Sequence, residues 1–329
     1  MDINVFSTAE HFIRQQIADG IVPCAVMAAR QKNDLRISIL NGQGKNSPEL
    51  RDQAYLLASI TKAVVGTLFA ILHERNIIRF DDRLCDLLPE MADPADAATT
   101  VGNVFTHCTG YRTGVTLIDR EKFTPENYFL EILREGRAYP PRTAMEYSTM
   151  TYNLLSAAVF RKTGQRLPQL LQEYIFAPAR MLHTSFKPSI RRMPVIDWEK
   201  SYSQPVEALM DSEMAGAGLW STLDDLLNLS DALQSGKLIS PETLRLVTEV
   251  KDPLPMLNCP EKMSRRTWGW NKEIIFPGQP ESGFFHGGAT GTMVWIDPAE
   301  DFTFIFLTNR WCCGNDHAFS ILKYFYPGV

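Results

Sequence analysis

The chain has 329 residues, with 45% hydrophobic residues, 22% charged residues and a formal net charge of −5. These values are typical of a soluble globular protein with one large domain or two smaller ones. No basic run is long enough to form a surface for nucleic acid or for an anionic membrane, so we expect neither as a partner.

The N-terminus lacks the pattern of a secretory signal. Its first residues, MDINVFSTAEHFIRQQIADG, contain no positive region followed by an apolar core. No apolar run in the sequence reaches the length of a membrane span. The six cysteines are irregularly spaced and form no C-x-x-C pair, which favours free thiols in a reducing compartment. We therefore expect a cytoplasmic protein, unless a leader has been removed.

The first part of the chain predicts a helix, two strands and a second helix. The stretch Ser7-Thr8-Ala9-Glu10 has the pattern of a capping box, which predicts a helix that ends near Gly20. Residues Ala25–Gln31 and Leu35–Leu40 read as strands joined by a turn. A longer helix begins at Ser59, and its wide apolar face predicts burial on most sides.

The middle of the chain is dominated by helical signals, and strand signals return in the last third. The predicted helices of the middle part are Pro125–Arg134, Met150–Thr163, Pro168–Phe176 and Thr222–Gln234. The late strands are Arg266–Ile275, Gly283–His286, Gly291–Ile296 and Phe302–Thr308, followed by a final helix, Asp316–Tyr324.

This order of elements predicts an α+β fold. Short connections between the late strands indicate an antiparallel sheet, which the first two strands join. We expect N- and C-terminal helices to flank this sheet and an all-helical subdomain to be inserted. Residues 1–80 and 246–329 would form the α/β part and residues 81–245 the helical part of a single catalytic domain, 1–329.

A serine and a lysine open the long helix, in the stretch Ser59-Ile60-Thr61-Lys62. Positions i and i+3 share a helix face, and a lysine near an apolar core has a lowered pKa, so its amine can activate the hydroxyl. A capping serine and a snorkelling lysine explain the same pattern equally well at this point. A second S-x-x-K, Ser320 to Lys323, is expected by composition alone.

Two further stretches favour the catalytic interpretation. They are EYSTMTYN, residues 146–153, and FHGGATGT, residues 285–292. S-x-x-K followed by Y-x-N and then by K-T-G or H-x-G resembles the serine β-lactamase and penicillin-binding-protein superfamily. The similarity covers nearly the whole chain and is greater to the class C β-lactamase-related group, which includes family VIII carboxylesterases.

The resemblance implies a fold of the β-lactamase and transpeptidase type and a role for each matching residue. Ser59 would be the nucleophile that forms an acyl-enzyme, and Lys62 would help to deprotonate it. Tyr147 would be the general base, which needs a nearby cation because a free tyrosine has a pKa of about 10. The amides of Ser59 and Ala289 would form an oxyanion hole. No cofactor and no metal ion are implied, and the partner is a small acyl substrate.

The sequence departs from the superfamily pattern at two places. Thr149 replaces the Asn of Y-x-N, which leaves one hydroxyl to bond the lysine and the substrate, or a helix N-cap as the alternative. His286-Gly287-Gly288 replaces K-T-G, so a histidine that is only partly charged near neutral pH stands where the superfamily has a fixed cation. The two glycines would let the strand edge approach the substrate closely. The alternative for His286 is a structural core histidine.

We therefore expect a serine hydrolase that acts mainly as an esterase on small acyl esters. The alternatives are a β-lactamase, a D-amino-acid peptidase or an amidase, an acyl transferase, and a non-catalytic binding protein of the same fold. If Lys62 and His286 jointly hold Tyr147 ready, activity should depend on pH between about 6 and 9. The sequence does not predict an oligomeric state.

Overall fold

The computed structural model describes residues 2–91, 93–112, 124, 127–198 and 213–326. Its centre is a five-stranded sheet in the order β2-β1-β9-β8-β7, with antiparallel neighbours throughout. The strands are β1 (Ala25–Gln31), β2 (Asp34–Leu40), β7 (Phe284–Gly287), β8 (Met293–Asp297) and β9 (Phe302–Leu307). The first two strands join the late ones through the pairing of β1 with β9, which confirms the predicted fold class.

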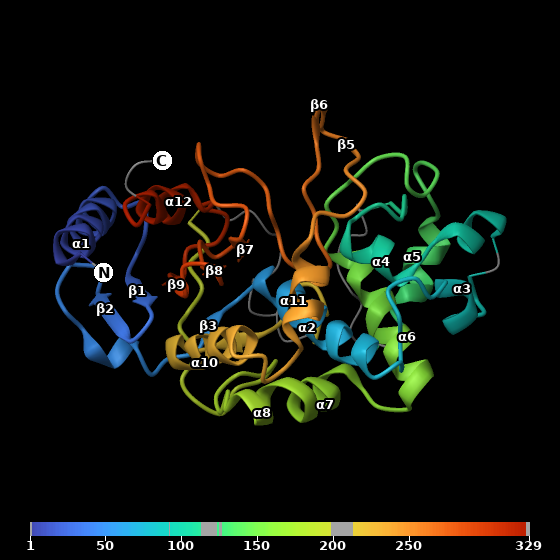
Figure 1. Ribbon diagram of the computed structural model, residues 1–329, viewed down its shortest axis with the longest axis horizontal. Coiled ribbons are helices and arrows are strands. Elements are labelled where there is room, and N and C mark those ends of the chain that lie inside the picture. The colour runs from blue at the N-terminus through green and yellow to red at the C-terminus, as the bar shows by residue number, and fades with distance from the viewer. Residues whose placement is uncertain (1, 92, 113–123, 125–126, 199–212, 327–329) are drawn as a thin grey trace.

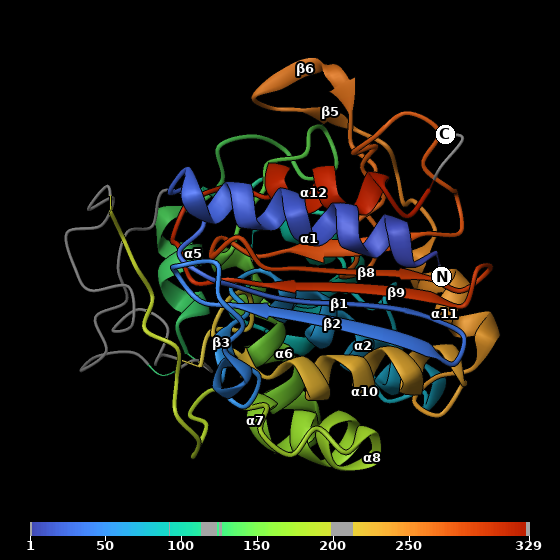
Figure 2. The same cartoon turned by 90° about the vertical axis from the view of Figure 1, so that its left-hand side faces the viewer.

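Both faces of the sheet are buried. Helices α1 (Ile3–Ala18) and α12 (Asp316–Lys323) cover one face, and α2 (Ile60–Glu74) and α10 (Leu223–Gln234) cover the other (Figures 1 and 2). Successive side chains of a strand point to opposite faces. In β8, Trp295 therefore packs in the cluster with α1 and α12, whereas Val294 and Ile296 pack in the cluster with α2.

The remaining helices lie beyond the β7 edge of the sheet on the right of Figure 1, or at its centre and bottom. They are α3 (Leu84–Leu87), α4 (Val101–Phe105), α5 (Phe129–Glu135), α6 (Asn153–Thr163), α7 (Leu167–Leu171), α8 (Ala177–Ala179) and α11 (Pro241–Thr248). Short helical turns are η1 (Pro48–Leu50), η2 (Pro94–Ala98), η3 (Met150–Tyr152) and the π-helical η4 (Gln172–Phe176), and the short strands are β3 (Tyr55–Leu56), β4 (Trp220–Ser221), β5 (Pro255–Met256) and β6 (Cys259–Met263).

The helices predicted in the middle of the chain are largely confirmed. The range 150–163 is η3 followed by α6, the range 168–176 is α7 with η4, and α5 occupies most of 125–134, whose first two residues lie outside the described part. Helix α10 packs on the sheet, where Ser230 Oγ lies 2.5 Å from Thr303 Oγ1 of β9. The exact division into residues 81–245 and the rest stays a prediction.

The first helix begins earlier than the sequence predicts. Asp2 caps it, because the Asp2 side chain accepts a hydrogen bond from the Asn4 amide at 2.9 Å. The expected capping-box residues therefore lie inside the helix, where the Thr8 hydroxyl donates to the Asn4 carbonyl at 2.8 Å.

The strand predicted over residues 266–275 is wrong. This stretch forms a tight turn around Gly269, whose φ of +100° is unfavourable for residues with a side chain. Its backbone lies directly on α2, since a Cβ at Gly66 would come within 2.6 Å of the Trp268 carbonyl oxygen. The apolar tryptophans that suggested a strand therefore belong to a loop that is pressed against the helix carrying Ser59.

Candidate active site

Ser59 lies at the corner between β3 and α2. The preceding residue, Ala58, has a left-handed φ of +45°, which turns the chain from the strand into the helix. Ser59 occupies the N-cap position of α2, yet its side chain makes no capping hydrogen bond. The hydroxyl instead accepts a hydrogen bond from Lys62 Nζ at 3.1 Å. A side-chain capping role for Ser59 is therefore wrong.

Lys62 is fully buried and makes three hydrogen bonds. Its Nζ donates to Ser59 Oγ and Thr149 Oγ1, both at 3.1 Å, and to the Gly216 carbonyl oxygen at 2.7 Å. Burial lowers the pKa of Lys62, since a buried ammonium loses its hydration. The snorkelling alternative is wrong, because this amine points into the protein beside the serine.

Tyr147 lies beside the same amine, with 39% of the residue exposed. Its ring centroid is 4.8 Å from Lys62 Nζ and 5.1 Å from Arg266 Cζ. Burial raises the pKa of the Tyr147 phenol, but the positive charges of Lys62 and Arg266 and the polar surroundings of the phenol outweigh burial and hold that pKa below its ordinary value. Tyr147 is thus an activated phenol next to a serine hydroxyl.

His107 holds the backbone on both sides of Tyr147. The Glu146 amide donates to the His107 carbonyl oxygen at 3.0 Å, and the Ser148 amide donates to His107 Nδ1 at 3.1 Å. The two rings also lie together, with centroids 4.4 Å apart. Burial holds the pKa of His107 well below its ordinary value, so the ring is neutral and its Nδ1 can accept.

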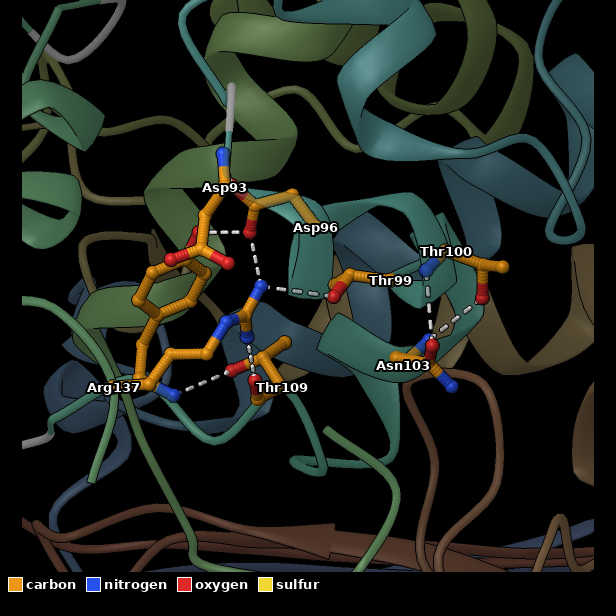
Figure 3. Close-up of polar contacts among 8 residues, drawn as sticks. Asp93, Asp96, Thr99, Thr100, Asn103, Thr109 and Arg137 are labelled. Carbon is orange, nitrogen blue, oxygen red and sulfur yellow. Dashed lines mark hydrogen bonds and ion pairs between the residues drawn. The ribbon is translucent and has the colours of Figure 1, made fainter. Parts of the chain in front are cut away.

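A buried ion pair fixes the turn that follows His107 (Figure 3). Arg137 pairs with Asp96, donates to the Thr109 carbonyl oxygen and donates to Thr99 Oγ1 at 3.0 Å. The Arg137 guanidinium also lies 4.0 Å from the centre of the Tyr111 ring. The side chains of Asp96 and Arg137 are 3% and 12% exposed, so the pair is largely removed from water. This network anchors the segment from which His107 reaches Tyr147.

Thr149 takes part in the site through its hydroxyl. It precedes η3 but makes no side-chain capping bond, and its Oγ1 accepts from Lys62. Its backbone lies against Gly216, where a Cβ would come within 2.6 Å of the Thr149 carbonyl oxygen. Thr149 therefore stands at an N-cap position without capping through its side chain, and it makes the contact to lysine that the family resemblance implied for the replaced asparagine.

His286 is buried on the edge strand β7, on the face that packs against α2. Burial and the nearby Lys62 charge lower the pKa of His286 to about 3. Its Nδ1 lies 2.8 Å from the Gly287 carbonyl oxygen, which can only accept, so Nδ1 carries the proton of the neutral ring. The expected partial charge near neutral pH is wrong, because desolvation disfavours the imidazolium in this position.

The two glycines after His286 face protein atoms. A Cβ at Gly287 would come within 2.5 Å of Asn315 Oδ1, and one at Gly288 within 2.3 Å of the Leu57 carbonyl oxygen. The glycines therefore permit the protein's own packing, whereas the sequence suggested an approach to substrate. This packing presses the turn after β7 against the corner that carries Ser59.

The turn after β7 brings Ala289 next to that corner. Thr290 Oγ1 donates to the Leu56 carbonyl oxygen at 2.8 Å, and Ala289 packs on the small apolar cluster that contains Ala58. In the part of the chain that the structure describes, no hydrogen bond to another protein group engages the amide of Ser59 or of Ala289. These two amides can therefore donate to a developing oxyanion.

The structure brings together all the residues that the sequence singled out, and it adds three. These three are Arg266, His107 and Gly216. Arg266 belongs to a stretch that was predicted as a strand, and the spacing of His107 suggested no metal site. Gly216 contributes only its backbone carbonyl oxygen. No local pattern in the sequence identifies them, because each reaches the site through packing of distant segments.

Within the described residues, no group of three or more His, Cys, Asp and Glu side chains could hold a metal ion. The helices of the described part are also too short or too polar to cross a bilayer.

The chain is similar to several known proteins. The curated relatives include the "Putative penicillin-binding protein PbpX" of Bacillus subtilis (strain 168), 24% identical over 195 residues, which cover 58% of this chain and only 49% of that protein. Esterase EstB of Burkholderia gladioli is 22% identical over 240 residues, which cover 60% of this chain and 61% of the esterase. The chain thus spans about half to two thirds of the length of these two relatives.

A solved structure shows the same fold along the whole chain. The structure described as EstCE1, a hydrolase with promiscuous acyltransferase activity, superposes with a TM-score of 0.77 at 17% identity and covers 98% of this chain and 99% of its own. The Beta-lactamase family matches residues 9–316. The chain belongs to the Beta-lactamase family, and its fold is that of solved structures of a putative β-lactamase and a penicillin-binding-protein homologue.

Proposed function

We propose that the protein is a serine hydrolase in which Ser59 forms an acyl-enzyme, and that its substrates are small acyl esters. One observation carries the proposal. The fully buried Lys62 amine lies 3.1 Å from the Ser59 hydroxyl, which caps nothing. Burying an amine is costly, and a catalytic role explains why the chain retains it at this position.

The neighbouring groups supply the other steps of acyl transfer. Tyr147 as a phenolate takes the Ser59 proton while Ser59 Oγ attacks the ester carbonyl carbon. The amides of Ser59 and Ala289 receive the charge that develops on the carbonyl oxygen. The Tyr147 phenol then returns its proton to the leaving alkoxide, and water attacks the acyl-enzyme by the reverse of these steps.

The charges around the site favour a neutral substrate. His286, at the place of the K-T-G lysine, is held neutral by burial. Arg266 is a permanent cation, contrary to the expected absence of one, but its guanidinium lies over Tyr147 and its Nε lies 3.8 Å from Glu273. Both contacts engage this charge within the protein, and Glu273 neutralises part of it. We therefore expect a substrate carboxylate to gain less here than at an unpaired lysine.

Amide chemistry is the second candidate, and Thr149 is the observation that favours it. Its hydroxyl makes the contact to Lys62 that the asparagine of Y-x-N would make. Acyl transfer to an alcohol is a variant of the ester reaction, in which the alcohol replaces water as the acceptor. An assay with and without added alcohol separates transfer from hydrolysis.

The test compares the wild type, Ser59→Ala and Ser320→Ala on p-nitrophenyl butyrate and on nitrocefin. Ser320 begins the second S-x-x-K in α12 and is a matched control. We expect ester cleavage that is lost in Ser59→Ala, kept in Ser320→Ala and much faster than nitrocefin turnover. Faster turnover of nitrocefin would favour the lactamase and amidase alternative. Full activity of Ser59→Ala, or a failure of a fluorophosphonate to label Ser59, would reject the proposal, and the second result would favour a non-catalytic binding protein.

A further inference from the structure

Arg266 is a second cation on the phenol that the proposed mechanism uses as its base. Its Cζ lies 5.1 Å from the Tyr147 ring centroid, a distance close to the 4.8 Å that separates Lys62 Nζ from the same point. The Arg266 side chain is 13% exposed, so water screens its charge less than that of a surface arginine. The positive charge of Arg266 acts with that of Lys62 in holding the pKa of the Tyr147 phenol below its ordinary value.

The fold holds Arg266 in this position through its backbone. Gly269 and Gly66 allow the loop to rest on α2, since a Cβ at Gly269 would come within 2.9 Å of the Lys62 carbonyl oxygen. The Lys251 amide also donates to the Arg266 carbonyl oxygen at 2.8 Å. The arginine is therefore fixed relative to the helix that carries Ser59 and Lys62.

We infer that Arg266 supplies the permanent positive charge that the superfamily takes from the K-T-G lysine, and that it holds Tyr147 in the form that accepts the Ser59 proton. The inference rests on the proposed role of Tyr147. It explains how a neutral His286 can replace a lysine at the end of β7, because the missing charge comes from another segment of the chain.

Few other charges face the phenol. Lys62 faces it from α2, and His107 from the turn after α4 is neutral because burial lowers its pKa. Tyr152 from η3 is uncharged, since burial raises the pKa of its phenol well above the ordinary value. The two cations, Lys62 and Arg266, therefore set the protonation of Tyr147.

A carboxylate limits the effect of Arg266. Glu273 Oε1 lies 3.8 Å from Arg266 Nε and also accepts the Arg265 amide at 3.1 Å. Removing the negative charge of Glu273 would leave more of the positive charge of Arg266 to act on Tyr147. Two substitutions in the same pair should therefore act in opposite directions on Tyr147, which a general loss of stability would not do.

The measurement is the rate at which a fluorophosphonate labels Ser59 between pH 5 and pH 10. Loss of the Arg266 charge raises the pKa of Tyr147, and it also removes a repulsion that lowers the pKa of Lys62. In Arg266→Gln we expect the profile to move to higher pH by about one unit, with slower labelling at pH 7. In Glu273→Gln we expect a shift to lower pH.

Two further variants serve as controls. Arg266→Lys keeps the charge and should keep most of the wild-type profile. Arg265→Gln removes the same charge from the neighbouring residue, which pairs with Glu281 at 3.0 Å, and should leave the profile unchanged. Thermal melts identify a variant that does not fold. The remaining variants still show in which direction the pH profile of labelling moves.

An unchanged profile in folded Arg266→Gln, or shifts of equal sign in Arg266→Gln and Glu273→Gln, would overturn the inference. A wild type that is never labelled would overturn the proposed function instead, so the two failures are distinguishable.

Discussion

The imidazole of His107 lies against the phenol of Tyr147, with ring centroids 4.4 Å apart and ring planes inclined by 37°. The same imidazole accepts the amide of the next residue, Ser148. A neutral ring thus positions the phenol while Lys62 and Arg266 supply the charge. His107 therefore positions Tyr147 and the two cations set its charge, so different measurements can test the two contributions.

His107 should affect the rate of the reaction more than substrate binding. In His107→Leu we expect kcat on p-nitrophenyl butyrate to fall by about 10- to 100-fold with KM within about threefold, because Tyr147 loses its fixed position. His107→Asn keeps an acceptor for the Ser148 amide and should lose less. Steady-state kinetics on variants with an unchanged melting curve test this, and a rise of KM at constant kcat would contradict it.

Lys62→Met should separate activity from stability. We expect activity to fall by about 1000-fold or more, whereas the free energy of unfolding should rise by about 1 kcal/mol, because an apolar side chain replaces a buried amine. The folded-state pKa of Lys62 is lowered, so the folded wild type loses stability as pH falls from the unfolded pKa towards the folded one. The stability gain of the variant should therefore be larger at pH 7 than at pH 10. Urea titrations at both pH values measure it, and an equal or reversed difference would refute the argument.

Thr149 should act through its hydroxyl. Thr149→Ser retains an acceptor for Lys62 and should keep kcat/KM within about threefold of the wild type. Thr149→Val has the same shape without the hydroxyl, and we expect a loss of about tenfold, which corresponds to one hydrogen bond of about 1.4 kcal/mol. Equal activities of the two variants would show that the hydrogen bond from Lys62 Nζ to Thr149 Oγ1, at 3.1 Å, does not contribute to the rate.

His286 should not determine the pH dependence between pH 6 and pH 9. With its pKa lowered to about 3, the imidazole has lost its proton well below this range. His286→Asn keeps a donor for the Gly287 carbonyl oxygen, and both limbs of its kcat/KM profile should coincide with those of the wild type, whatever the height of the maximum. A displaced limb in this variant would show that His286 titrates within the range.

Removing one partner of the buried ion pair between Asp96 and Arg137 should cost much stability (Figure 3). Arg137→Met leaves the buried Asp96 without its cation, and we expect a loss of about 3 to 5 kcal/mol. The double variant with Asp96→Asn should recover part of this loss, because no unpaired charge then remains buried. Urea unfolding of the single and double variants forms the test, and a loss below about 1 kcal/mol in Arg137→Met would contradict it.

Local sequence patterns were sufficient to predict the helices and strands whose formation depends on their own residues. Strand β1 has the predicted bounds, and helix α10 lies where the helical spacing of its apolar residues predicted it, because that apolar face can be buried only in one register. The pattern failed at residues 266–275, where two tryptophans suggested a strand. The backbone of this stretch lies instead against Gly66 of α2, a contact that no local signal reveals.

The sequence by itself determined the order of the elements, the antiparallel sheet, and the motif residues Ser59, Lys62 and Tyr147. The tertiary structure alone decided that the imidazole of His286 is neutral and that a cation reaches Tyr147 from Arg266. The physical reason is that motifs are read from neighbours along the chain, whereas pKa values depend on burial and on charges that folding brings close.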